Sequence, residues 1–148
     1  MSGRAFEDFP IGAHLQSDRI EVTEESIIEF AKRFDPQPFH IDPATAQGTL
    51  FGGLAASGWQ TAAISMRLFI QTMNVPGGII GMGVDELRWP NPVRPGDQLR
   101  LDMEIIAARL SKSRPGFGII RIHNVTRNQR DEIVQSFETS AMLPTRQE

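Results

Sequence analysis

The sequence of 148 residues contains no cysteine and no tyrosine. A chain without thiols forms no disulfide, offers no thiolate ligand to zinc and has no cysteine nucleophile. Because the phenol is absent as well, proton transfer in any reaction falls to aspartate, glutamate, histidine or lysine. No spacing of histidine, aspartate and glutamate indicates a metal site either.

Long apolar runs are also missing. No stretch approaches the 18 or so apolar residues of a membrane span, and no basic and then apolar leader precedes Arg4. We therefore expect no membrane span and no signal peptide, and a cytoplasmic location. Acidic and basic residues are interspersed and the net charge is −3, so neither nucleic acid nor an anionic membrane is an expected partner.

What the sequence does contain suits one globular domain. Its apolar fraction of 40% and its length allow a sizeable core. We expect a single domain over residues 1–148, with residues 1–12 as a polar N-terminal arm.

The hydrophobic periodicity predicts an α+β chain. A helix near residues 58–73 is apolar on nearly all sides, which indicates burial, and the strand after residue 97 alternates apolar with charged side chains. These patterns predict an antiparallel sheet that wraps around the helix. One sheet covers only part of such a helix, so a second copy of the chain is the simplest way to bury the remaining apolar face. In chain order we expect a strand over 14–22, a helix over 24–34, an extended loop over 35–42, a short turn over 42–47, the apolar helix, and strands over 79–89, 98–108, 117–127 and 132–142.

Asp35 and His40 are the strongest candidates for acid-base chemistry, and Pro36 and Pro38 stiffen the chain between them. Five extended residues at ~3.1–3.3 Å each span ~16 Å, so the loop must bend for both groups to reach one substrate. In a purely structural interpretation, the aspartate caps a turn and the imidazole packs in the core. In the functional interpretation, one group activates water and the other holds or delivers a proton, as the addition of water to a polarised double bond requires.

A segment rich in glycine, alanine and serine leads into the apolar helix over residues 51–59. The first turn of a helix has unpaired amides and a positive dipole end, and Gly58 allows a ligand to approach closely. The Gly58 amide is therefore a candidate donor to a substrate carbonyl. Tight packing or turn geometry is the alternative role for Gly52, Gly53 and Gly58.

Three ordered motifs together resemble the MaoC-like dehydratase family, which includes the (R)-specific enoyl-CoA hydratases. The resemblance covers roughly residues 10–143. The motifs are Asp35-x-Gln37-Pro38-x-His40-x-Asp42, Gly53-Leu54-Ala55-Ala56-Ser57-Gly58 and Pro92-Val93-Arg94-Pro95-Gly96-Asp97.

This resemblance implies a hot-dog fold, usually paired with a second copy, and a catalytic pair formed by Asp35 and His40. It places the amide of Gly58 at the thioester carbonyl. The implied reaction is hydration of a trans-2-enoyl thioester to the (R)-3-hydroxyacyl product, or the reverse dehydration. The acyl carrier is coenzyme A or acyl carrier protein, and no cofactor is needed beyond coenzyme A in the substrate. Gln37 departs from the asparagine usual in the family, which bears on the substrate more than on the reaction.

Further substrate-binding candidates are Gln37, Phe39, Ser57 and Trp59. Basic residues are expected near the phosphates of coenzyme A. The candidates for this role are Arg67, Arg88, Arg94, Lys112 and Arg114.

Two other functions stay open. A hot-dog thioesterase would normally place a carboxylate on the central helix, and residues 59–73 contain neither aspartate nor glutamate. A non-catalytic module that binds acyl thioesters would keep the fold without the chemistry, and the intact pair of Asp35 and His40 argues against it. His14 and His123 have no partner motif, so we expect structural roles for them.

Overall fold

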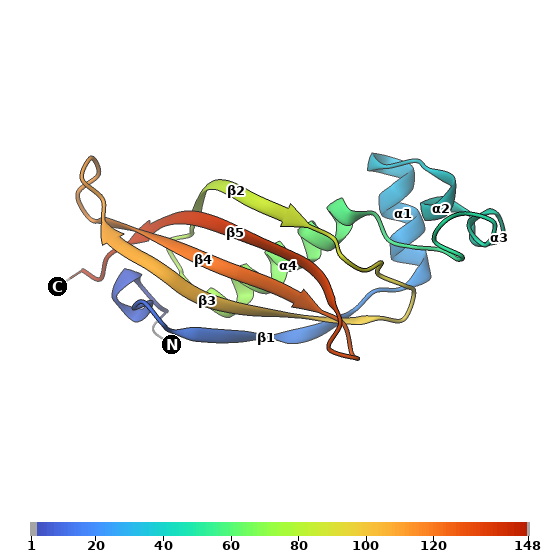
Figure 1. The fold of residues 1–148 in the computed structure, drawn as a ribbon. Coiled ribbons are helices and arrows are strands. Elements are labelled where there is room, and N and C mark those ends of the chain that lie inside the picture. The colour runs from blue at the N-terminus through green and yellow to red at the C-terminus, as the bar shows by residue number, and fades with distance from the viewer. Residues whose placement is uncertain (1–2, 148) are drawn as a thin grey trace.

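The computed structural model describes residues 3–147, so the first two residues of the expected arm and residue 148 lie outside the described residues. One antiparallel sheet has the strand order β1-β3-β4-β5-β2, and helix α4 lies along one of its faces (Figure 1). This arrangement confirms the α+β prediction. The strands are β1 (His14–Glu21), β2 (Ile80–Arg88), β3 (Gln98–Leu110), β4 (Phe117–Arg127) and β5 (Ile133–Pro144); the helices are the 3-10 turn η1 (Phe6–Asp8), α1 (Glu24–Phe34), α2 (Pro38–Ile41), α3 (Pro43–Ala46) and α4 (Gly58–Met73).

The core lies between the sheet and α4. On β3 the alternating apolar side chains of Leu99, Leu101, Met103 and Ile105 are all buried, as predicted from their two-residue period. From the helix, Phe69 and other buried apolar residues pack in one cluster with Leu101, Met103 and Ile105. The strand period therefore identified the inner face of the sheet correctly.

Helix α4 is buried on one side only within this chain. Trp59, Met66 and Ile70 are exposed by 60%, 46% and 45%. Polar side chains such as Thr61 and Ser65 occupy part of the buried side instead. This partial burial is what we expect of a single chain, because one sheet covers only one face of a helix that is apolar on nearly all sides.

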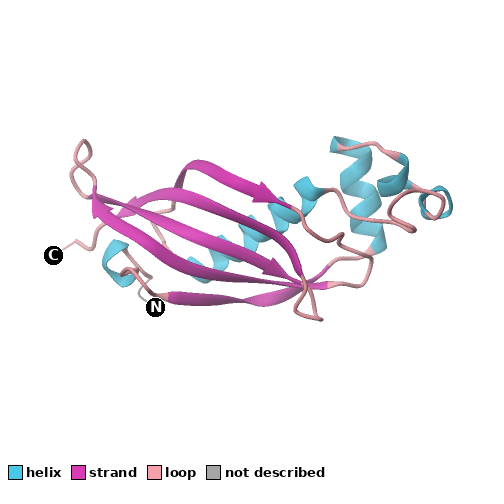
Figure 2. Cartoon of the chain, viewed as in Figure 1, coloured by secondary structure: helices cyan, strands magenta, loops and turns pink. Residues whose placement is uncertain are grey.

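Helices α1, α2 and α3 gather at one end of the sheet, beside the first turn of α4, and η1 lies at the other end (Figure 2). Thr23 caps α1 by accepting a hydrogen bond from the amide of Ser26 at 3.1 Å. The helix ends at Phe34, as the following Pro36 requires.

The prediction of an extended loop over residues 35–42 is only partly correct. Asp35 and Gln37 do precede prolines and have extended φ values, but Pro38 starts the one-turn helix α2. A proline at the first helical position sacrifices no hydrogen bond and has a φ that suits a helix. The turn directs His40 back toward Asp35.

The N-terminal segment packs on the sheet rather than forming a free polar arm. Phe9 is 1% exposed and joins the core beneath α4, and Asp8 pairs with Arg146 near the other end of the chain. The apolar side chains within this mostly polar segment explain why it packs on the sheet.

Within residues 3–147, no helix has both the length and the apolar character needed to cross a membrane.

Candidate active site

Asp35 and His40 face each other despite the prolines between them. Oδ2 of Asp35 lies 3.3 Å from Nε2 of His40. The one-turn helix α2 produces this contact, which an extended chain would not make. The imidazole is 5% exposed, whereas the Asp35 side chain retains 20% exposure, so the pair opens to solvent on the side of the carboxylate.

The other ring nitrogen fixes how the imidazole is protonated. Nδ1 of His40 lies 2.6 Å from the carbonyl oxygen of Ala55. A carbonyl only accepts, so Nδ1 carries a proton and donates it. In the neutral ring, Nε2 is then the free base and points toward Asp35. Phe39 packs edge-on against the ring at 4.7 Å and holds its plane.

Asp35 is surrounded by donors. Nε2 of Gln37 donates to its Oδ1 at 2.5 Å. Partial burial raises the pKa of Asp35, but hydrogen bonding by Gln37 and Ser57 and the charge that His40 carries when protonated outweigh burial and leave the pKa below its ordinary value. Asp35 is therefore ionised at neutral pH.

The start of α4 lies next to this pair. Ser57 caps the helix by accepting from the amide of Trp59 at 3.2 Å, and the same side chain helps to lower the pKa of Asp35. Among the described residues, nothing accepts a hydrogen bond from the amide of Gly58, as expected in a first helical turn. That amide is available to a substrate oxygen.

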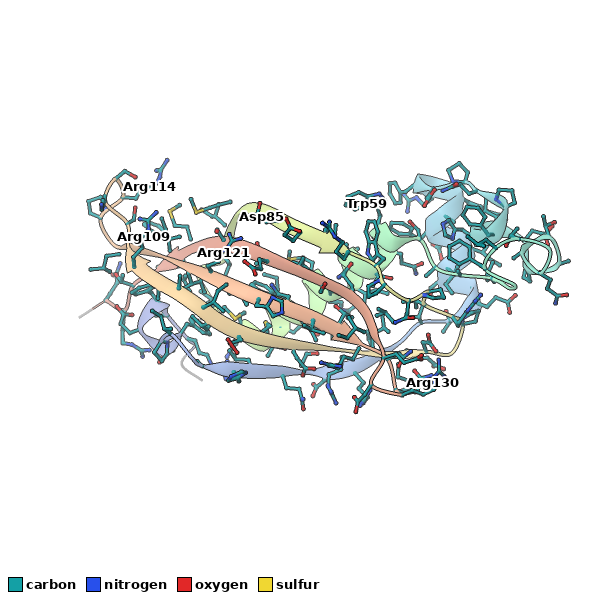
Figure 3. The ribbon with its side chains drawn as sticks, in the orientation of Figure 1. Trp59, Asp85, Arg109, Arg114, Arg121 and Arg130 are labelled. Carbon is teal, nitrogen blue, oxygen red and sulfur yellow. The ribbon has the colours of Figure 1, made fainter. Side chains whose placement is uncertain are left out.

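A hollow of about 470 Å³ lies between His40 and Gly58, whereas Asp35 is not among its lining residues. It brings together four predicted site residues, namely Gln37, Phe39, His40 and Gly58. Ser57 is fully buried behind it, and Trp59 is not among the lining residues and points outward from the start of α4 (Figure 3). The full lining is Gln37, Phe39, His40, Phe51, Ala56, Gly58, Thr61, Trp89, Pro90, Asn91, Pro92, Val93 and Val134.

Sequence reasoning missed Trp89 in this site. A Cβ on Gly58 would lie 2.5–2.8 Å from three indole carbons, so the ring rests directly on this glycine. The indole N–H donates to Oε1 of Gln135 at 2.8 Å. The available signal was an aromatic residue at the end of a strand, immediately before the Pro-Asn-Pro segment.

Arg94 does not face a phosphate-binding surface. Its guanidinium donates to the carbonyl oxygens of Phe51, Gly53 and Leu54. Of the other basic candidates, Arg88 pairs with Glu86. Figure 3 shows Arg114 at the far end of the sheet from Trp59, so it does not reach the site of its own chain.

Comparison with known proteins places this geometry in a family. Residues 8–122 match the MaoC like domain. The chain belongs to the MaoC-like dehydratase family. A MaoC-like dehydratase from Rhodospirillum rubrum is 46% identical, with a TM-score of 0.92 over 99% of this chain and 100% of that one. The (R)-hydratase PhaJ1 from Pseudomonas aeruginosa is 25% identical, with a TM-score of 0.80 over 96% of this chain and 86% of that one.

The MaoC-like neighbours confirm the hot-dog fold, and they are hydratases and dehydratases. A curated relative, 3-hydroxyacyl-thioester dehydratase Z from Mycobacterium tuberculosis, is 34% identical over 94 residues, which is 62% of each protein.

Within residues 3–147, no group of three or more histidine, aspartate and glutamate side chains is arranged to hold a metal ion.

Proposed function

We propose that this MaoC-like protein adds water to trans-2-enoyl thioesters to give (R)-3-hydroxyacyl thioesters, or catalyses the reverse dehydration. The observation that carries the proposal is the contact of 3.3 Å between Asp35 and His40, at the edge of a hollow that His40 and Gly58 both line. A base, a carboxylate and an amide donor are the groups that this addition needs.

In the proposed mechanism, a water molecule binds beside the pair, within hydrogen-bond reach of both the Asp35 carboxylate and Nε2 of His40. Asp35 accepts one hydrogen bond and orients the water, since this carboxylate stays ionised. As the water oxygen bonds to C3 of the substrate, Nε2 takes its proton. The negative charge of Asp35 then stabilises the imidazolium.

The thioester carbonyl is proposed to accept a hydrogen bond from Gly58. As the C3–O bond forms, electrons move through the double bond to this oxygen, and the amide and the positive end of α4 stabilise the enolate. His40 then returns its proton to C2 from the same face. The water thus supplies both the hydroxyl and the hydrogen, and the enzyme ends in its starting state without a cofactor.

The decisive experiment is incubation of the purified protein with crotonyl-CoA, followed by the loss of the enoyl thioester absorbance. We expect hydration by the wild type and a fall in kcat of at least about 100-fold in His40→Gln and Asp35→Asn, a size typical of acid-base groups. Chiral analysis of the product should give the (R) alcohol. If the wild type hydrates no short, medium or branched enoyl thioester, the proposal is wrong.

The same assay separates the two alternative functions. Release of free coenzyme A without hydration would indicate a thioesterase, and binding without turnover would indicate an acyl-thioester module. Within α4, no carboxylate is present to serve a thioesterase. The choice between coenzyme A and acyl carrier protein, the homodimer and the cytoplasmic location stay predictions.

A further inference from the structure

The segment over residues 51–57 joins both halves of the candidate site but has no regular secondary structure. Its carbonyl at Ala55 contacts Nδ1 of His40, and its last residue, Ser57, caps α4 and helps to lower the pKa of Asp35. A displacement of this segment would move the base, the carboxylate and the amide donor together. The contacts that hold this segment in place therefore bear on the proposed catalysis.

Arg94 is the main side chain that holds the segment. Nη1 donates to the carbonyl oxygens of Gly53 at 3.0 Å and Leu54 at 3.2 Å, and Nη2 donates to that of Phe51. These carbonyls belong to neither a helix nor a strand, so the guanidinium supplies the donors that a regular ladder would otherwise supply.

The backbone beside Arg94 is fixed to the same segment and to the sheet. The carbonyl of Val93 accepts from the amide of Ala56 at 2.9 Å. The Arg94 amide donates to Oδ2 of Asp97 at 2.8 Å, and Asp97 is 3% exposed. The motif of residues 92–97 thus forms a rigid base from which the side chain reaches residues 51–54.

From this geometry we propose that Arg94 is a positioning residue. By holding residues 51–57 it keeps the Ala55 carbonyl on Nδ1 of His40, which leaves Nε2 as the free base. It also sets the distance from Ser57 and Gly58 to Asp35. The catalytic part of this inference rests on the proposed hydration, whereas the effect on the protonated nitrogen of His40 does not.

Arginine suits this role for a specific reason. A planar guanidinium directs several N–H groups at fixed angles and stays charged, so it can bind three carbonyls at once. A lysine ammonium in the same place keeps the charge but loses the fork. Arg94→Lys should therefore restore part of what Arg94→Gln removes.

The first test compares hydration by Arg94→Gln and Arg94→Lys with that of the wild type. We expect kcat to fall about 10- to 100-fold in the glutamine variant, a size typical of residues that orient a catalytic group, while KM changes less than about threefold. The lysine variant should lie between. Arg121→Gln is the matched control, because Arg121 pairs with Asp85 and Glu138 away from the site, and its kcat should change by less than about twofold.

The second test does not depend on activity. The ¹⁵N resonances of the His40 ring report which nitrogen is protonated, and we expect Nδ1–H in the wild type and a mixture in Arg94→Gln. If this variant is too unstable, Arg94→Gly with added guanidinium ion should recover the wild-type resonances and rate. Retention of both the Nδ1–H pattern and kcat in a folded Arg94→Gln variant would overturn the inference.

A different result would identify Arg94 as a phosphate ligand instead. In that case KM alone would rise for enoyl-CoA in Arg94→Gln, and it would not change for an enoyl N-acetylcysteamine thioester, which lacks phosphates. This outcome also overturns the positioning role. If the wild type hydrates neither substrate but the ring resonances respond to Arg94 as expected, the proposed function fails while the structural part of the inference stands.

Discussion

At the scale of single residues, Asp35 and His40 have different hydrogen-bond partners, which suits them to different parts of the proposed reaction. The carboxylate receives donors from Gln37 and Ser57, which favour its charged form. Nδ1 of the imidazole donates a hydrogen bond to the Ala55 carbonyl, and Nε2 faces Asp35. Gln37 therefore has a defined function here, since its longer side chain still reaches Asp35 at 2.5 Å.

The lowered pKa of Asp35 predicts how stability depends on pH. In the unfolded chain an aspartate has a pKa of about 3.9, above that in the fold. Ionised Asp35 therefore stabilises the fold above the unfolded pKa, and this contribution is lost as the pH falls through the folded pKa. In urea unfolding, the advantage of the wild type over Asp35→Asn should shrink from about pH 5 to about pH 3.

The matched control is Asp18→Asn, which removes an exposed carboxylate elsewhere on the chain. Its difference from the wild type should stay nearly constant over the same pH range. An advantage for Asp35 that grows on acidification would contradict the inferred direction of the shift.

Gly58 is expected to tolerate no side chain. A Cβ would overlap Trp89 at 2.5–2.8 Å, so Gly58→Ala should lower the free energy of unfolding by about 1–3 kcal/mol. It should also reduce kcat/KM by at least tenfold, because the amide and the indole must separate. Trp89→Leu in the same chain should recover stability beyond the sum of the two single changes, measured by urea unfolding.

Gly48→Ala serves as the control, because a Cβ built on this loop residue meets only the carbonyl oxygen of Thr45, at an ordinary contact distance of 3.7 Å. If Gly58→Ala were as stable and active as this control, the close approach of Trp89 would have no functional consequence.

At the scale of elements, a buried polar network connects α4 to the sheet and to the hollow. Gln135 is fully buried, accepts from the Trp89 indole at 2.8 Å and donates to the hydroxyl of Ser65 at 2.9 Å. Ser65 and Thr126 share a further bond of 2.8 Å. These contacts fix the indole as a rigid wall of the hollow rather than a mobile gate.

The network predicts a measurable coupling. Gln135→Leu leaves the Trp89 N–H without its acceptor and should cost about 1–3 kcal/mol, and Trp89→Phe leaves Gln135 unpaired at a similar cost. The double variant removes both polar partners, so its loss should be smaller than the sum. Urea unfolding of the four proteins measures this, and strictly additive losses would show that the bond contributes nothing.

The helices and strands were largely predictable from the sequence, except for the one-turn helix α2. Caps, proline positions and the periods of 2 and 3.6 located every strand and the long helices, because those signals are local. The rule that residues before proline avoid helix was correct for Asp35 and Gln37. It did not reveal that Pro38 itself begins a helical turn, and this turn is what brings His40 to Asp35.

At the scale of the whole molecule, two exposed apolar surfaces remain. The first is the outer face of α4, with Trp59, Met66 and Ile70. The second is β2, an edge strand whose described pairing is to β5 alone and whose Met82 and Val84 are exposed by 54% and 53%. Exposed apolar patches with a free strand edge are typical of surfaces that associate.

We expect these two surfaces to form the interface of a homodimer. Light scattering after size exclusion should give the mass of a dimer for the wild type and of a monomer for Ile70→Glu and Met82→Glu, because a charge in an apolar interface is costly to desolvate. Leu110→Glu is the control, since Leu110 is 63% exposed on the distant hairpin. A monomeric wild type at micromolar concentration would contradict this expectation.

The sequence by itself determined the class of fold, the order of its elements, the catalytic candidates and the glycine at the start of the central helix, because each depends on local spacing or on an ordered motif. Only the tertiary structure decided which groups act together. Arg94 reaches Phe51 across 43 positions and Trp89 reaches Gln135 across 46. Contacts between residues so distant depend on how the sheet and helix pack, and no local pattern in the chain encodes that distance.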